Sequence, residues 1–570
     1  MTDLIERARI WIAGDPDPTT RAELERIVAE GDLAELETRM NTTLEFGTAG
    51  IRGKVGAGPG RMNRAVVIRT THGLARYLLT GDDADSEIRV VIGFDARPTS
   101  RQFAEDAAGV LAAADIAVHY FPDMAPTPLV AFAAKHLVVS AAVVVTASHN
   151  PPEDNGYKVY GSDASQIVSP TDHAIQEGIA TAPPASSIGR VEDVFAGASA
   201  LVTPVPEDIV DRYWDEVSAT RSRRTGSQLS IVYTPIHGVG LKTFFEVMRR
   251  AGHEEVEAVP EQAEPDGTFP TVDFPNPEEP GALDLALDLS RRRSADLLLA
   301  NDPDADRLAV VVPHAGQWRP LSGNEVGVLL GDYLLRNDPQ PTSAIVASSI
   351  VSSPMLRSVA TSYGARYEPT LTGFKWIVRA GLSLQEELGG RFVFGYEEAL
   401  GYTVGSAVRD KDGISAGLLF TDLTADLADS GASILDRLVE LWRAHGLWVS
   451  AQTSIASTGP GGQGAMGDAV DRLAGAPPDL VAGMAVTAVT DYRHGAGQRP
   501  PWLGTQDLVE LSLGDQGRIL VRPSGTEPKL KVYVDLRGEV GDEPDNDHAA
   551  LSTRAMEVGE IIGDGIDLRA

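Results

Sequence analysis

The chain has 570 residues, no cysteine, a formal charge of −32 and 43% apolar residues. This length exceeds a single core and predicts several domains, and the lack of cysteine excludes disulfides and thiolate chemistry. The acidic balance argues against nucleic-acid binding, and no apolar run approaches the ~18 residues of a membrane helix. Because the first residues also lack a secretory signal, we expect a cytoplasmic protein without nucleic-acid or membrane partners.

Cationic residues are fewer than acidic ones, and most of them are arginine. Eight of the 49 cationic residues are lysine, and six of these lie in or next to motifs punctuated by glycine or proline. The overall field repels anions, so any phosphate site must be a local cluster of cations. Lysines are therefore useful site markers in this chain, because arginine is not an equivalent substitute for them.

In chain order, the first part predicts a helical lead-in followed by an α/β domain. Thr2–Ala13 and Arg21–Met40 have helical spacing and are separated by two prolines. The Gly-rich stretch 46–53 allows a ligand close to the backbone, and its Arg52 can donate to phosphate, although an ordinary turn remains an alternative. Strand–helix alternation over 90–145 then predicts a mostly parallel sheet.

The stretch Thr146–Pro151 directly follows the apolar run Ala141–Val145. The run predicts a buried strand, so Ser148 and His149 lie at the carboxyl edge of a sheet, where α/β proteins bind ligands. A serine needs activation to act as a nucleophile, and the G-x-S-x-G elbow of acyl hydrolases is absent. We therefore interpret Ser148 as a carrier of a phosphoryl group.

Asp302, Asp304 and Asp306 alternate just after a second predicted strand, Asp296–Ala300. Alternate residues of an extended segment point the same way, so these carboxylates can converge on Mg²⁺. An EF-hand starting at Asp302 is excluded, because arginine and proline occupy the positions that require glycine and glutamate. A solvated acidic turn remains an alternative.

Further candidates follow in the second half of the chain. Glu397 and Glu398, after the predicted strand Arg391–Phe394, are suited to accept hydrogen bonds from sugar hydroxyls, or are exposed loop carboxylates. The stretch Arg522–Lys529 offers a guanidinium, hydroxyls and backbone N–H groups around a glycine. This composition predicts a phosphate cradle, with an ordinary Pro-Gly turn as the alternative.

Taken together, these motifs resemble the α-D-phosphohexomutase superfamily, which covers phosphoglucomutases and phosphomannomutases. The motifs occur in family order, and the lead-in and the stretches 46–53 and 395–399 are most similar to the branch of phosphoglucomutase-2 and phosphopentomutase. The resemblance implies three related mixed-sheet α/β domains plus a smaller α+β C-terminal domain in a heart-shaped arrangement. The expected domains are a lead-in with the phosphoserine domain (1–205), a metal-binding domain (206–322), a sugar-recognition domain (323–447) and a mobile phosphate-binding lid (448–570).

The resemblance also implies roles for individual residues. Ser148 is expected to be phosphorylated and to hold Mg²⁺ together with Asp302, Asp304 and Asp306. Arg52, Lys158 and His149 are expected in catalysis, with Lys158 acting as a base only if its pKa falls. The expected substrate-binding residues are Thr48, Arg307, Gly373, Phe374, Lys375, Glu397, Glu398, Arg522, Ser524, Gly525, Thr526 and Lys529.

The predicted reaction moves a phosphate between C1 and C6 of a hexose, with glucose first and mannose second. It uses Mg²⁺ and glucose 1,6-bisphosphate as activator and intermediate, in a monomer or weak dimer whose ligands are sugar phosphates. One departure affects the choice of sugar: Ala399 stands where many hexomutases have a serine. The alternatives are a phosphopentomutase, a glucose-1,6-bisphosphate synthase, a Mg²⁺-dependent sugar phosphatase and a non-catalytic sensor.

Overall fold

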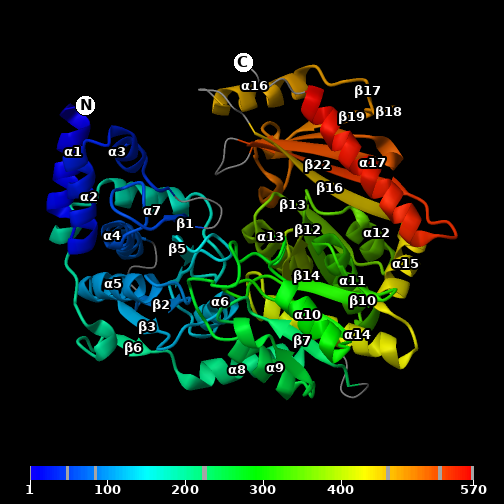
Figure 1. Cartoon of the computed structure of the whole chain (residues 1–570), viewed down its shortest axis with the longest axis horizontal. Coiled ribbons are helices and arrows are strands. Elements are labelled where there is room, and N and C mark those ends of the chain that lie inside the picture. Colours follow the sequence, from blue (N-terminus) through cyan, green and yellow to red (C-terminus); the bar gives the residue numbers. More distant parts are fainter. Residues whose placement is uncertain are drawn as a thin grey trace. The chain divides into compact units, whose positions relative to one another are not determined.

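The computed structural model describes residues 2–45, 50–81, 87–220, 228–456, 462–523 and 529–565 (Figure 1). The contacts divide the chain into two compact units. The first unit contains Met1–Pro320 and Tyr402–Asp422, and the second contains Leu321–Gly401 and Leu423–Ala570. Each unit therefore consists of two separate stretches of the chain.

Three helices form the lead-in of the first unit: α1 (Thr2–Gly14), α2 (Pro18–Glu30) and α3 (Leu33–Met40). The predicted helix over 21–40 is thus interrupted, because Gly31 adopts a left-handed conformation with φ of 71° and ends α2. Asp17 and Asp32 cap α2 and α3 through their side chains. The helices share a small apolar core that includes Leu24, Ile27 and Leu36.

The first large sheet has the strand order β1-β5-β4-β2-β3-β6. Strands β4, β2, β3 and β6 run parallel, whereas β1 and β5 join antiparallel at the edge. Helices α4, α5 and α7 share a core with one face of this sheet, and α6 packs against β2 and β4. The elements are β1 (Ile51–Lys54), α4 (Arg64–Thr80), β2 (Arg89–Phe94), α5 (Ser100–Ala113), β3 (Ala117–Tyr120), α6 (Thr127–His136), β4 (Ala141–Val145), β5 (Asp154–Tyr160), α7 (Thr171–Ala180) and β6 (Val202–Pro204).

A second sheet of the first unit has the order β11-β10-β9-β7-β8, with β8, β7 and β9 parallel. The turn after strand β9 carries the predicted metal ligands, so this sheet positions the acidic cluster. The elements are α8 (Glu207–Ala219), β7 (Ile231–Thr234), α9 (Leu241–Arg250), β8 (Val256–Ala258), α10 (Asp284–Arg293), β9 (Leu297–Ala300), β10 (Ala309–His314) and β11 (Gln317–Pro320).

One sheet of the second unit contains three parallel strands, which lie side by side in the order β13, β12, β14. A capping box formed by Ser322 and Glu325 starts the unit's first helix. The elements are α11 (Gly323–Asn337), β12 (Ala344–Ser349), α12 (Met355–Ser362), β13 (Arg366–Thr370), α13 (Phe374–Leu388), β14 (Arg391–Glu397) and, later in the chain, α15 (Ile434–His445). Between β14 and α15 lie β15 (Gly401–Val404) and α14 (Gly413–Asp429), most of whose residues belong to the first unit.

The last sheet, also in the second unit, is antiparallel with the order β16-β22-β21-β20-β19. Helix α17 packs along β16 and β22, as Figure 1 shows in red and orange. One apolar cluster joins Ile350, Val351 and Leu371 to Leu520 and Tyr533 of this sheet. The elements are β16 (Leu447–Ala456), α16 (Gly462–Gly475), β17 (Leu480–Val481), β18 (Met484–Ala485), β19 (Ala488–Asp491), β20 (Val509–Ser512), β21 (Gly517–Pro523), β22 (Lys529–Gly538) and α17 (Pro544–Gly565).

Seven short 3₁₀ helices complete the described structure: η1 (Ala185–Ser187), η2 (Val194–Ala196), η3 (Pro260–Gln262), η4 (Pro341–Ser343), η5 (Ala496–Gln498), η6 (Pro501–Leu503) and η7 (Gly514–Gln516). Among the described residues, none of the helices is both long and apolar enough to cross a membrane. Helices flanking mixed sheets, followed by a separate antiparallel sheet, agree with the predicted α/β class.

Candidate active site

Ser148 lies in the turn after β4 and is 1% exposed. Its φ of 51° is left-handed, an unusual conformation for a non-glycine residue and one that marks functional turns. The Thr146 hydroxyl accepts a hydrogen bond from the backbone N–H of Ser148 at 2.9 Å. The Ser148 hydroxyl in turn donates to Oδ2 of Asp302 at 2.6 Å, so the predicted nucleophile and the predicted metal ligand are in contact.

Arg97 holds this turn in shape from the loop after β2. Its side chain is buried, and it forms an ion pair with Asp95 at 3.4 Å. The guanidinium donates hydrogen bonds at 2.6–2.8 Å to four carbonyl oxygens, those of Ser148, Asn150, Pro151 and Asp154. A planar fork with several donors suits this task, and a lysine could not reproduce it.

Asp302, Asp304 and Asp306 converge as predicted, and all three are at most 1% exposed. One ligand atom from each lies within 4.8 Å of the others. The geometry differs from the predicted extended segment: the residues occupy a turn in which Ala305 has a φ of 57°. The extended alternation was therefore wrong, and the turn brings the carboxylates together instead.

The cluster has the properties of a cation site. Buried Oδ1 atoms of Asp304 and Asp306 have no hydrogen-bond partner among the described residues. Unpaired buried carboxylate oxygens are costly, and Mg²⁺ prefers oxygen ligands of this kind. The residues therefore fit the predicted metal.

Charge is unevenly distributed within the cluster. Burial, together with the neighbouring Asp304 and Asp306, raises the pKa of Asp302 well above its usual range. Burial also acts to raise the pKa of Asp304, but the ammonium of Lys158 and hydrogen bonds from Lys158 and Thr127 outweigh it and hold that pKa low. The pKa of Asp306 is likewise lowered despite burial and the charge of Asp304, because Lys158 and Lys411 oppose them.

Two lysines and a threonine surround these carboxylates. Lys158 on β5 lies 2.6 Å from Asp304 and 3.0 Å from Asp306, and Lys411 lies 3.2 Å from Asp306. Burial acts to lower the pKa of Lys158, but the two carboxylates raise it overall, so Lys158 is a cation here and not a base. The Thr127 hydroxyl donates to Asp304 at 2.6 Å.

The remaining predicted residues of the first unit lie around Ser148. Nδ1 of His149 lies 3.2 Å from the Ser148 hydroxyl, and burial plus the charges of Arg307 and Arg52 lowers the pKa of His149 well below its usual value. Its imidazole is therefore neutral. Arg52 on β1 lies 3.4 Å from the Asn150 side chain, and the backbone N–H of Arg307 donates to Asp302 at 3.0 Å.

The predicted sugar-binding carboxylates belong to the second unit. Glu397, at the end of β14, accepts a 2.7 Å hydrogen bond from the backbone N–H of Gly373. Oε2 of Glu398 accepts from the hydroxyls of Ser349 and Ser352 at 3.2 and 3.1 Å. Both carboxylates are only partly buried, so hydrogen bonds hold them in place while they keep contact with solvent.

Other residues predicted to bind substrate differ in their surroundings. Phe374 is 3% exposed and packs in the apolar core beneath β12, and Lys375 is 8% exposed beside the Trp376 ring. The guanidinium of Arg522, on β21, donates to the Tyr533 hydroxyl at 3.3–3.4 Å. Lys529 begins β22, whereas Thr48, Ser524, Gly525 and Thr526 lie outside the described residues.

Comparisons with known proteins decide the family. Models of the phosphoglucomutase/phosphomannomutase family match in order: the alpha/beta/alpha domains I, II and III over residues 43–185, 211–316 and 322–444, and the C-terminal domain over 468–539. The chain belongs to this family. Its predicted membership of the phosphohexomutase superfamily, its four-domain α/β fold class and its identity as a phosphomutase enzyme are thereby confirmed.

Individual relatives carry different sugar names. The chain is 41% identical to a probable phosphomannomutase from Haemophilus influenzae, over 84% of this chain and 93% of the relative. It is 34% identical to a phosphopentomutase from Mus musculus, over 97% and 92%. A putative phosphomannomutase structure from Thermus thermophilus matches with a TM-score of 0.68 at 23% identity, covering 92% of this chain and all of that one.

Three residues of this phosphomutase site were not predicted: Arg97, Thr127 and Lys411. Arg97 follows a predicted strand, as Asp95 does, but nothing in the sequence shows that it reaches the Ser148 turn 51 residues later. The rarity of lysine was a usable signal for Lys411, because it lies in the motif Arg409–Gly413. Its contact with Asp306 depends on folding of segment 402–422 into the first unit.

Proposed function

We propose that this phosphomutase interconverts hexose 1-phosphate and hexose 6-phosphate through a phosphorylated Ser148. The observation that carries the proposal is the 2.6 Å contact between the Ser148 hydroxyl and Asp302 within a buried cluster of three carboxylates. The three carboxylates beside this hydroxyl repel a phosphate group unless a cation is present. The cluster thus suits metal-assisted phosphoryl transfer.

The proposed metal site consists of Asp302, Asp304, Asp306 and an oxygen on the Ser148 side chain. Bound Mg²⁺ would neutralise charge on the phosphoryl group during transfer. Lys158 and Lys411, which compensate the carboxylates here, would also supply positive charge at the reacting group.

The reaction would proceed in two transfers. Phosphoserine would give its phosphoryl group to a sugar hydroxyl: a bond from phosphorus to the sugar oxygen forms, the bond to Ser148 Oγ breaks, and the proton lost by the sugar hydroxyl is balanced by one taken up at Ser148 Oγ. After the sugar turns around, Ser148 Oγ would attack the other phosphate, the bond from that phosphorus to the sugar oxygen would break, and the sugar oxygen would leave as a hydroxyl with a proton equivalent to the one that Ser148 loses. Nδ1 of neutral His149 lies 3.2 Å from Ser148 Oγ, so this side chain would assist by orienting the serine oxygen for that second step.

Residues of the second unit would bind the sugar and the phosphate that is not transferred. Glu397 and Glu398 would accept hydrogen bonds from hydroxyls, and Arg522 with Lys375 and Lys529 would bind the phosphate. The proposed phosphate loop also includes Ser524, Gly525 and Thr526, and Thr48 and Arg307 would contact substrate near Ser148. Gly373 and Phe374, which precede Lys375 in the chain, would belong to the same substrate-binding segment.

Glucose is our first choice of sugar, with mannose second and a pentose as the alternative. Two observations favour the pentose: Ala399 lacks the hydroxyl that many hexomutases have, and the mouse phosphopentomutase matches nearly the whole chain. Glucose-1,6-bisphosphate synthase activity would use the same first transfer.

The proposal is tested by measuring kcat/KM for glucose 1-phosphate, mannose 1-phosphate and ribose 1-phosphate side by side, with Mg²⁺ and glucose 1,6-bisphosphate. The largest value for glucose supports the hexose assignment, and the largest value for ribose replaces it with the pentose. Release of inorganic phosphate should stay far below product formation. Stoichiometric phosphate release would identify a phosphatase and contradict the mutase mechanism.

A further inference from the structure

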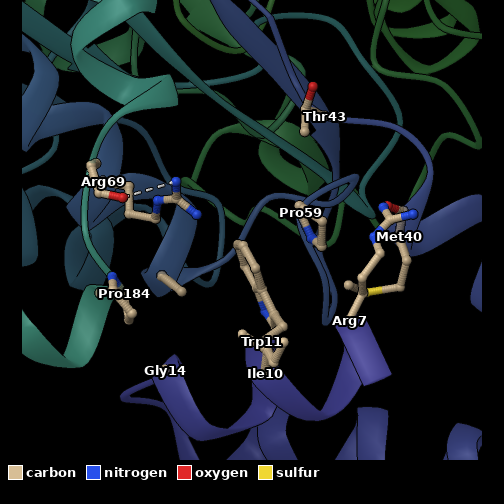
Figure 2. A pocket seen from close by; sticks show the side chains of 12 residues that line it. Arg7, Ile10, Trp11, Gly14, Met40, Thr43, Pro59, Arg69 and Pro184 are labelled. Atoms are coloured by element: carbon tan, nitrogen blue, oxygen red, sulfur yellow. Dashed lines mark hydrogen bonds between the residues drawn. The ribbon is translucent and has the colours of Figure 1, made fainter. Parts of the chain in front are cut away.

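The pocket in Figure 2 lies in the first unit, between α1 and the first α/β domain, and has a volume of about 380 Å³. Apolar side chains such as Ile10, Trp11 and Met40 make up most of its wall, and none of the described residues that are predicted to bind substrate lines it. The predicted sugar-binding residues lie instead in the second unit, after β13 and at the end of β14. The surroundings of these strand ends, and not this pocket, therefore bear on the choice of sugar.

Two consecutive backbone N–H groups after β13 have acceptors on different strands of the unit. The N–H of Gly373 donates to Oε1 of Glu397 at 2.7 Å, and the N–H of Thr372 donates to Oε1 of Gln506 at 3.3 Å. Nε2 of Gln506 also donates to the Thr372 hydroxyl, so this amide contacts Thr372 twice. Gly373 has a φ of 109°, which side chains rarely tolerate, so the turn has a specific shape. The turn thus links the sugar-binding Glu397 to Gln506.

Gln506 belongs to a long segment of the last sheet, residues 492–508, which connects β19 to β20. The guanidinium of Arg499 shapes this segment by donating at 2.7–3.1 Å to four of its carbonyl oxygens, those of Tyr492, His494, Leu503 and Gly504. The carbonyl oxygen of Trp502 in the same segment accepts a 2.9 Å hydrogen bond from the N–H of Leu371. The segment is therefore a folded element that contacts the substrate-binding turn at two points, through Trp502 and Gln506.

A second connection from the last sheet reaches Glu398. Oε2 of Glu398 accepts from the Ser352 hydroxyl, and the same hydroxyl accepts from the backbone N–H of Glu398, both at 3.1 Å. Arg518, on β21, donates from Nη2 to the Ser352 carbonyl oxygen at 2.8 Å and from Nε to Asp535 at 2.8 Å. Asp535 is 1% exposed and also accepts from the Ser450 hydroxyl, so the guanidinium has a fixed partner on one side and Ser352 on the other.

We propose that Gln506 and Arg518 are positioning residues for sugar recognition. Gln506 acts on Glu397 through the turn at Thr372, and Arg518 acts on Glu398 through Ser352. A carboxylate that is already oriented binds a hydroxyl more tightly, because it loses less freedom when the sugar arrives. The last sheet, predicted to be a phosphate-binding lid, thereby contributes to the choice of sugar as well. This inference rests on the proposed sugar-phosphate site, but not on which of the three sugars binds there.

Double-mutant cycles test the two paths. The reference protein is the full chain with Ser148→Ala, in which no turnover interferes, and the ligand is whichever of glucose, mannose and ribose 1-phosphate it binds most tightly with Mg²⁺ by isothermal calorimetry. Gln506→Ala should weaken binding about five- to tenfold, but less than about twofold once Glu397→Ala is present, because the carboxylate that it positions is gone. Arg518→Lys keeps a charge beside Asp535 but cannot donate to both partners, so it should behave in the same way with Glu398→Ala.

The crossed pairs are the matched controls. Gln506→Ala combined with Glu398→Ala, and Arg518→Lys combined with Glu397→Ala, should weaken binding by about the product of the single effects, because each path ends at a different carboxylate. Gln516→Ala, which changes an exposed glutamine between β20 and β21, should bind the sugar phosphate as the reference protein does. Melting temperatures show whether each variant folds, and the Gln506 cycle decides by itself if Arg518→Lys does not fold.

The outcomes separate this inference from the proposed function. Additive losses in the matched pairs would show that Gln506 and Arg518 do not act through the carboxylates, and equal coupling in all four pairs would show a general loosening of the fold. Either result, or unchanged binding in both single variants, would overturn the positioning roles while the sugar-phosphate site stands. A reference protein that binds none of the three sugar phosphates would contradict the proposed site itself.

Discussion

The acidic cluster of the first unit and the carboxylates of the second are built in opposite ways. Asp302, Asp304 and Asp306 are at most 1% exposed and rely on Lys158 and Lys411 for charge balance. Glu397 and Glu398 are partly exposed and are held by a backbone N–H and by two serine hydroxyls. Buried charges of one sign need a cation, whereas exposed carboxylates remain available to neutral hydroxyls.

This contrast assigns different consequences to the two regions. Changes around Ser148 should lower kcat and alter stability, because they disturb buried charge and the geometry of transfer. Changes around Glu397 and Glu398 should alter KM and the choice of sugar. The following four predictions test that division, beginning with the largest effect.

Ser148→Ala should abolish turnover, lowering kcat by roughly four orders of magnitude or more, because no other hydroxyl replaces a covalent nucleophile. The fold should persist, since the side chain makes one hydrogen bond to Asp302 and contacts His149. A coupled assay for the mutase reaction, with circular dichroism for folding, measures both. Retention of wild-type turnover in this variant would exclude Ser148 as the carrier.

Asp302→Asn should lower kcat roughly a thousandfold, because a metal ligand contributes several kcal/mol to transfer. It should also stabilise the metal-free protein. Since burial raises the pKa of Asp302, the folded state keeps a proton that the unfolded state releases above about pH 4, so this group lowers stability as pH rises.

Thermal unfolding in a chelator, followed from pH 5 to pH 8, measures this effect. The variant should melt above the wild type, and the difference should increase with pH to a few °C. Added Mg²⁺ should raise the melting temperature of the wild type alone, which is the matched control. A variant that melts below the wild type across this range would contradict the predicted direction of the Asp302 shift.

Arg97→Lys should lower kcat about 10- to 100-fold with little change in KM, because the Ser148 turn loses several hydrogen bonds to carbonyl oxygens and shifts. Arg101→Lys is the matched control, since Arg101 is exposed and gives one hydrogen bond to the Pro122 carbonyl. Steady-state kinetics of both variants decide the point. Equal kcat values for them would mean that Arg97 does not position the turn.

Ala399→Ser should have the smallest effect, changing the ratio of kcat/KM between glucose 1-phosphate and ribose 1-phosphate by about tenfold or less. The added hydroxyl lies next to Glu398 and gives a hexose one more partner, so the ratio should move toward glucose. Thermal stability should not change, because the side chain is partly exposed. If the ratio stays constant while kcat falls, residue 399 affects phosphoryl transfer and not the choice of sugar. That result would contradict the division of roles between the two regions.

The sequence was most informative where chemistry is local. The strand Ala141–Val145 was predicted with its observed bounds, and Ser148 and the three aspartates were identified from short motifs. Contacts between distant segments were not predictable: Thr127 with Asp304, separated by 177 residues, depends on how two sheets pack. The predicted conformation of the aspartate segment was also wrong, because no sequence pattern indicates that Ala305 adopts a left-handed conformation.

Helix boundaries show the same limit. The run over 21–40 has helical spacing throughout, but the single Gly31 ends α2 with a left-handed cap. Protonation states could not be predicted from the sequence either. Lys158 was expected to act as a base only if its pKa fell, but the neighbouring carboxylates of Asp304 and Asp306 raise that pKa. Such properties depend on partners that only the folded chain brings together.

The central claim is that Ser148 carries a phosphoryl group, and intact-protein mass spectrometry after incubation with glucose 1,6-bisphosphate and Mg²⁺ tests it most directly. We predict the mass of one added phosphate, assigned to Ser148 by fragmentation and lost on incubation with excess glucose 1-phosphate. Ser148→Ala should show no increment under the same conditions. A phosphate on another residue, or none on Ser148 in an enzyme that turns over, would contradict the account.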